Sequence, residues 1–279
     1  NNSGCKGVCN GVKNESVANA KHAKLCNTEE CYDDILLYKL KDRIGKASSD
    51  LVVILHQKGS HGPAYYKRIP DEYRKFTPEC RSVNLQDCTT SEIVNSYDNT
   101  ILYTDHFLYS VIGFLKGNAT RFDTAMIYMS DHGESLGENG LFLHGFSYAL
   151  APDTQIHIPF ISWISKEYSD DFGIDKNCLM QERERRYSHD NLFHSVLGLL
   201  QVSHHHDYLK QTGGRVFFLL VNAEPAAAVQ SAHINGNFLC RAGGVVGFNL
   251  VFQSLGDRIQ FRKGYRVADL AGQNWIAVA

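Results

Sequence analysis

Three short apolar runs along the chain predict strands. Leu51–Leu55 is apolar throughout, which is typical of a strand buried on both faces of a sheet. Thr124–Met129 predicts a second buried strand, and Ile158–Ile164 predicts a third with a proline near its start. The first two runs both lead into polar loops that contain glycine and histidine.

Apolar residues that recur three and four positions apart predict helices around these strands. Asp33–Ile44 predicts a helix whose apolar stripe holds Ile35, Leu36, Leu40 and Ile44. Ser91–Lys116 predicts one long amphipathic helix or two, and Asp190–Leu200 predicts another, capped by Ser188. This order of strands and helices predicts an α/β layered domain with a mainly parallel sheet.

A glycine-rich polar loop, Ser130–Gly145, follows the second predicted strand and holds two histidines and three carboxylates. Asp131 and a neutral His132 offer the oxygen and nitrogen donors that zinc accepts. Sites in α/β sheets gather at the carboxyl ends of strands, so we expect His61, after the first strand, at the same edge. A polar loop with one hydrogen-bonded histidine is the simpler alternative, and the density of potential ligands argues against it.

Composition narrows the class of protein. The chain has 279 residues, of which 43% are hydrophobic, enough to build a core. Its net charge is -2 and no basic block occurs, so we expect no nucleic-acid partner. No run of about 18 apolar residues exists, and the first residues are polar, so the sequence predicts neither a membrane span nor a signal peptide within this chain.

Six of the eight cysteines occur as close pairs in polar segments. The pairs are Cys5 with Cys9, Cys26 with Cys31, and Cys80 with Cys88. This spacing favours local disulfides in an oxidising compartment. A cytosolic metal site is the alternative, but no pair has the two-residue spacing of a zinc knuckle. Cys178 and Cys240 have no obvious partner.

The pattern changes after about residue 203, so we divide the chain into a domain of residues 1–203 and an unassigned extension of residues 204–279. The extension begins with a histidine triplet, His204–His206, which could bind metal weakly but is better explained as a solvated loop. Its apolar runs, such as Val216–Val221, show no clean period. An unrelated fusion or a shifted reading frame would explain this composition.

Ser130–Gly145 resembles the phosphoethanolamine transferases that modify lipid A, a family that includes the mobile colistin-resistance enzymes. Further similar segments are Asn2–Val8, Leu55–Gln57, Ser60–Tyr65 and Tyr97–Asn99, and the similarity continues to about residue 200. The resemblance implies an α/β/α fold of the alkaline phosphatase and sulfatase type. It also implies a location at the periplasmic face of the bacterial inner membrane, with membrane contact through an upstream domain.

The resemblance further implies zinc-dependent transfer of phosphoethanolamine from phosphatidylethanolamine to lipid A, through a phosphothreonine. It assigns zinc binding to Asp131 and His132, catalytic roles to His61, Glu134 and His144, and donor binding to Asn2, Ser3 and Lys6. His61 and His144 match histidines that can also hold a second zinc. The three cysteine pairs fit disulfides of this family.

The family places its nucleophilic threonine and one metal-binding glutamate before the segment that matches Asn1. We therefore expect both outside this chain, and we expect the chain alone to be inactive. One alternative is a phosphatase or sulfatase of the same superfamily. Such hydrolases often lack a segment like Asn2–Cys9, which favours the transferase. The other alternative is a metal-binding fragment without turnover.

Overall fold

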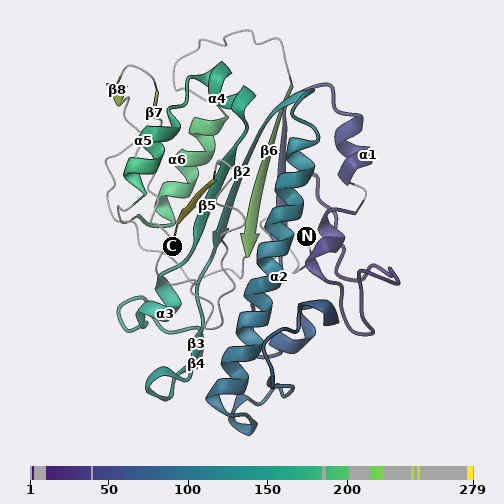
Figure 1. The fold of residues 1–279 in the computed structure, drawn as a ribbon, viewed down its shortest axis with the longest axis vertical. Helices are drawn as coiled ribbons and strands as arrows, with labels where there is room; N and C mark the ends of the chain where they lie inside the picture. The colour runs from purple at the N-terminus through teal and green to yellow at the C-terminus, as the bar shows by residue number, and fades with distance from the viewer. Residues whose placement is uncertain are drawn as a thin grey trace.

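The structure is a computed structural model that describes residue 2, residues 11–38, 40–183 and 187–200, and the backbone of several later strands. The described strands form a sheet of order β1-β6-β2-β5-β9 (Figure 1). Their bounds are Leu51–Gln57 for β1, Gly214–Asn222 for β6, Phe122–Ser130 for β2, Phe160–Ile164 for β5 and Trp275–Val278 for β9. Two further strands, β7 (Cys240–Arg241) and β8 (Gly244–Val245), pair only with each other.

The sheet is mixed, so a mainly parallel sheet is not confirmed. β6 pairs in parallel with β1 and β2, whereas β5 is antiparallel to both β2 and β9. β5 runs antiparallel to β2 because the chain leaves β2 and enters β5 at the same end of the strands. A parallel strand would need a crossover connection back to the opposite end. β6 belongs to the extension of residues 204–279, and the boundary near residue 203 stays a prediction.

Helices cover both faces of the sheet, which gives the expected α/β/α layering. The face toward α1 (Leu40–Gly45) and α2 (Thr90–Lys116) receives Phe122, Met126 and Tyr128 of β2. The opposite face, with Ala125 and Ile127, packs against α4 (Lys166–Phe172), α5 (Lys176–Glu182) and α6 (Asp190–Leu199). Figure 1 shows α2 on one side of the sheet and α4 to α6 on the other. The period of two along β2 produces both cores.

Among the described residues, helices cover β1 on one face only, so its predicted burial on both faces is wrong. Leu55 is buried in the core beneath α2, but Val52 and Ile54 are 45% and 54% exposed. Successive side chains of a strand point to opposite faces. The helices of the second face pack on β2 and β5 and do not reach the outer side of β1.

The long predicted helix is confirmed as the single helix α2. It begins with a capping box, in which Thr89 accepts from the Glu92 backbone and the Glu92 side chain accepts from the Thr89 backbone. The predicted Asp33–Ile44 helix is instead a 3-10 turn, η1 (Asp33–Leu36), followed by the separate α1, although its apolar stripe is buried. α6 is confirmed, and Ser188 caps it as predicted, because its hydroxyl accepts from the backbone nitrogen of Asp190 and its backbone nitrogen donates to the Asn191 side chain. His189, directly before the helix, has a helical backbone and makes no side-chain cap.

Two of the predicted disulfides are present, Cys26–Cys31 and Cys80–Cys88. Cys178 is disulfide-bonded as well. The remaining predicted pair, Cys5 with Cys9, lies outside the described residues. No helix in the described part of the chain is both long and apolar enough to span a membrane.

Candidate functional site

The candidate site lies at the carboxyl ends of β1 and β2, where a short hairpin places two functional side chains together. β3 (Ser135–Leu136) pairs antiparallel with β4 (Phe142–Leu143), with Ser135 opposite Leu143. Glu134, just before β3, and His144, just after β4, therefore lie side by side. The turn between them is η5 (Glu138–Gly140), preceded by Gly137 with a positive φ of 116°.

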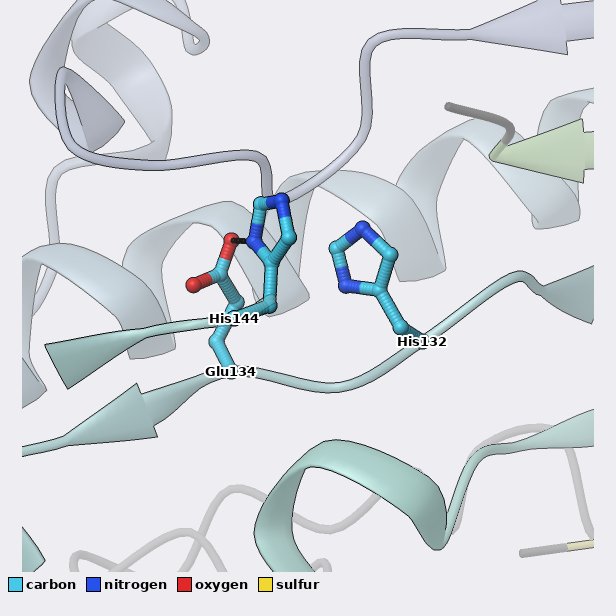
Figure 2. Close-up of side chains that lie close together, drawn as sticks. All are labelled: His132, Glu134 and His144. Atoms are coloured by element: carbon cyan, nitrogen blue, oxygen red, sulfur yellow. Dashed lines mark hydrogen bonds and ion pairs between the residues drawn. The ribbon is translucent and has the colours of Figure 1, made fainter. Parts of the chain in front are cut away.

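Three histidines meet at this edge, as the sequence predicts. The rings of His132 and His144 are stacked with centroids 3.8 Å apart. His61, from the loop after β1, has its ring centroid 5.0 Å from that of His144 and 6.2 Å from that of His132. Figure 2 shows His132 facing His144 from the loop that follows β2. Residues more than eighty positions apart in sequence are thus brought together.

Glu134 joins the hairpin to the loop after β1. Its side chain is buried, and Oε1 lies 3.1 Å from both His144 Nδ1 and the backbone nitrogen of Gly62, which donates to it. Oε2 accepts a hydrogen bond of 3.3 Å from the Tyr65 hydroxyl. Burial, and next the charge of Glu134, raise the pKa of Tyr65 far above its usual value, so this hydroxyl remains a donor.

Gly133 allows the loop to approach α3 (Asp153–Ile156) closely. Its backbone nitrogen donates to the carbonyl oxygen of Gln155 at 2.8 Å. A Cβ at this position would lie 2.1 Å from the carbonyl oxygen of Thr154, a contact that backbone atoms cannot accept. Only glycine therefore fits between the two candidate ligands His132 and Glu134.

The donor atoms of His132, Glu134 and His144 could hold a metal ion. One ligand atom from each lies within 4.8 Å of the others, and Nε2 of His132 is buried without a hydrogen-bond partner. Two imidazoles and a carboxylate are donors that zinc accepts, at bond lengths of about 2 Å, so the side chains would have to move together by roughly 1 Å. The residues present therefore fit a zinc ion in donor type.

Asp131, the other predicted ligand, is outside this cluster. Its Oδ1 accepts from the backbone nitrogen of His132 at 3.0 Å, and its Oδ2 lies 3.6 Å from His132 Nε2. Asp131 therefore borders the imidazole of His132, one of the three residues of the cluster. Its role as a ligand stays a prediction.

Asn2, predicted to bind the donor, is completely buried. Its side-chain amide donates to Asp33 Oδ1 at 2.8 Å and to the Cys31 carbonyl oxygen at 2.9 Å. Its backbone nitrogen donates to the carbonyl oxygen of His56 at 2.9 Å. These contacts anchor the chain beside β1, and none involves the histidine cluster. Ser3 and Lys6 lie outside the described residues.

Sequence reasoning missed three residues at this edge. Tyr65 donates to Glu134, and Asp33 accepts from the backbone nitrogens of Lys58 and Gly59 at 2.9 Å. His189 Nε2 lies 3.1 Å from the carbonyl oxygen of Ser130. A histidine directly before the helix predicted from Asp190 was a usable signal for His189, whereas a contact such as that of Asp33 depends on folding.

The fold and the cluster define an α/β/α domain with a candidate metal site at the carboxyl edge of its central strands. The chain belongs to the Sulfatase family, whose model matches residues 1–202. The fold is therefore of the alkaline phosphatase and sulfatase type.

Comparison with curated proteins gives relatives that are enzymes. The chain is 44% identical over 203 residues to the phosphoethanolamine transferase EptA of Escherichia coli strain K12, covering 72% of this chain and 37% of that protein. It is 37% identical over 138 residues to the Kdo(2)-lipid A phosphoethanolamine 7''-transferase of the same strain, covering 49% and 23%. The chain thus spans well under half the length of these relatives.

Solved structures of phosphoethanolamine transferase domains are also similar to this chain. The soluble domain of lipooligosaccharide phosphoethanolamine transferase A from Neisseria meningitidis has a TM-score of 0.69 and 47% identity, covering 72% of this chain and 60% of that one. The C-terminal periplasmic domain of phosphoethanolamine transferase EptC from Campylobacter jejuni has a TM-score of 0.61 and 39% identity, covering 73% and 61%. These solved domains, like the curated relatives, belong to enzymes named as phosphoethanolamine transferases.

Proposed function

We propose that this chain is part of the catalytic domain of a zinc-dependent phosphoethanolamine transferase. Its donor would be phosphatidylethanolamine and its acceptor lipid A. The observation that carries the proposal is the meeting of His61, His132, Glu134 and His144 at one sheet edge. The phosphoethanolamine transferase names of the relatives give the reaction class, and one of those names gives lipid A as the acceptor.

Zinc would be held by Asp131 and His132, and His61 and His144 could hold a second zinc. The metal would favour loss of the proton from an attacking hydroxyl and would screen the charge on phosphate oxygens. The attacking group would be the threonine that the resemblance places before Asn1. Glu134 accepts from His144 at Nδ1, and this fixes the tautomer in which Nε2 carries the lone pair. Its bonds to Gly62 and Tyr65 hold that carboxylate in place.

The proposed location is the periplasmic face of the bacterial inner membrane. Disulfides such as Cys26–Cys31 and Cys80–Cys88 persist in oxidising compartments, of which the periplasm is one. The solved domain from Campylobacter jejuni is periplasmic by its title. Membrane attachment would come from the part of the relatives' length that this chain does not span.

The test compares this chain with a longer protein that carries the upstream segment of a close relative. Bound zinc is measured by mass spectrometry of the metal, and transfer is measured as lipid A mass gained on incubation with phosphatidylethanolamine. We expect transfer by the longer protein and none by the chain alone. Release of free phosphoethanolamine without modified lipid A would instead support a hydrolase, and no turnover in either protein would support an inactive metal-binding fragment.

The ligand assignment has its own variant in the longer protein. Asp131→Ala should abolish zinc binding if Asp131 and His132 hold the ion. Full retention of zinc by this variant would contradict the assignment of Asp131, and the His132–Glu134–His144 cluster would then be the sufficient ligand set.

A further inference from the structure

An exposed apolar loop connects β4 to α3, directly after His144. Its residues 145–150 are all exposed, and among them Phe146, Tyr148 and Leu150 are 45%, 82% and 76% exposed. Burying such side chains is favourable, so three of them within five positions require an explanation. Most other exposed apolar residues, such as Val83, Tyr109 and Phe193, are isolated along the chain.

The loop also lacks charge. No Asp, Glu, Lys or Arg occurs between Glu138 and Asp153, although charged residues make up 21% of the chain. A loop selected only for solubility would be expected to carry charged side chains. This uncharged, apolar surface fits a partner that is itself uncharged and apolar where the loop meets it.

The loop is ordered. The backbone nitrogens of Leu150 and Ala151 both donate to the carbonyl oxygen of Ser147, at 2.8 and 2.9 Å, which closes a turn. The turn holds Tyr148 and Leu150 outward instead of letting them fold back onto the domain. In Figure 1 the connection between β4 and α3 lies at the same end of the molecule as the arrowheads of β2 and β6. This is the edge that carries the histidine cluster.

We propose that this loop inserts Phe146, Tyr148 and Leu150 into the interfacial region of a phospholipid bilayer. The inference rests on the proposed function, because a phosphatidylethanolamine donor keeps its acyl chains in the bilayer while its phosphate enters the site. His144 is only two residues from Phe146, so insertion of the loop brings the cluster to the level of the lipid headgroups. Aromatic side chains, tyrosine among them, favour this interfacial region.

The test is flotation of the full 279-residue chain with vesicles, and it needs neither zinc nor lipid A. One set of vesicles contains phosphatidylethanolamine with phosphatidylglycerol, and the other contains phosphatidylcholine with phosphatidylglycerol. The loop variant carries Phe146→Ser, Tyr148→Ser and Leu150→Ser. A matched control carries serine at Phe193, Tyr109 and Val83 instead. These side chains are 67%, 55% and 57% exposed at isolated positions.

We expect the loop variant to bind both kinds of vesicle at least about tenfold more weakly than the unmodified chain, and the control to bind normally. Equal binding by the loop variant would overturn the proposal. So would a loop variant that loses only self-association in sedimentation, because the loop would then contact a second copy. Because binding is measured without transfer, a failure of the proposed reaction would be visible separately.

A second measurement reports how deeply the loop enters the bilayer, and it keeps the apolar side chains in place. Tyr148→Trp should show a blue-shifted emission with vesicles and quenching by lipids with brominated acyl chains. Tyr109→Trp, on α2, should show neither effect. Absence of quenching at position 148 in vesicle-bound protein would overturn insertion of the loop.

Discussion

Two buried carboxylates hold opposite ends of the loop after β1, and they do so in different ways. Asp33 accepts from the backbone nitrogens of Lys58 and Gly59, at the start of the loop, and from the Asn2 side chain. Glu134 accepts from the backbone nitrogen of Gly62, near the end of the loop. Both side chains are almost inaccessible to solvent. They differ in their remaining partners.

The partners of Asp33 are amide N–H groups, which stay neutral and do not titrate at ordinary pH. Glu134 instead contacts His144, whose imidazole can gain or lose a proton and can bind a metal. We infer that Asp33 stabilises the fold and that Glu134 serves the candidate site, although both position the segment that carries His61. Variants at the two positions should therefore affect different measurements.

The largest expected effect is on folding. Asp33→Ala removes the acceptor of two buried hydrogen bonds and one part-buried hydrogen bond, and should lower the free energy of unfolding by about 3–5 kcal/mol. Urea unfolding followed by circular dichroism measures it. Asp171→Ala removes an exposed carboxylate from α4 and should change the free energy by less than about 0.5 kcal/mol. Equal effects at the two positions would contradict a structural role for Asp33.

A somewhat smaller loss of stability is expected where the segment between β2 and β3 contacts α3. Gly133→Ala places a Cβ against the Thr154 carbonyl oxygen and should cost about 2–3 kcal/mol, because backbone has to move. Gly113→Ala is the matched control, since Gly113 lies within α2 and a Cβ there meets nothing within 4 Å. That control should stabilise the protein by about 0.5–1 kcal/mol. Thermal unfolding of both variants measures these changes and so tests the close approach of Gly133 to the Thr154 carbonyl oxygen.

Glu134 and Asp33 also differ in how much of their role the sequence could predict. Glu134 lies in a stretch dense in ligand-type residues, and its role in the site was predicted from the resemblance of Ser130–Gly145 to a known family. Asp33 begins an apolar stripe and was assigned to a helix, and its actual contacts join segments that are 25 and 31 positions away. Similarly, the apolar run of β1 predicted a strand but not its open face, because the covering of Val52 and Ile54 depends on where distant helices pack.

At the chemical end of the comparison, Glu134→Gln should weaken zinc binding by about 10- to 100-fold with little change in stability. Glutamine keeps the shape of the side chain but is a weaker acceptor for His144 Nδ1. Glu138→Gln is a suitable control, because Glu138 accepts from the Leu136 backbone in the same hairpin without contacting a histidine. Competition titrations with a zinc chelator give the ratio of affinities. An unchanged affinity would remove Glu134 from the site.

The smallest effect tests the electrostatics of Asp33. Burial is the largest influence on its carboxyl group and raises the pKa above the ordinary 3.8, against the lowering by hydrogen bonds from Asn2, Lys58 and Gly59. As the pH rises above 3.8, Asp33 loses its proton in the unfolded chain but keeps it in the folded chain. The folded state therefore loses stability over this interval, until the pH passes the raised pKa of Asp33 in the folded chain. Asp33→Asn cannot titrate and provides the reference. Subtracting its free energy of unfolding from that of the unmodified chain, across a pH series, should give a difference that falls with rising pH. A difference that grows with pH would mean that the three hydrogen bonds outweigh burial, and Asp33 would then be a carboxylate stabilised in its charged form.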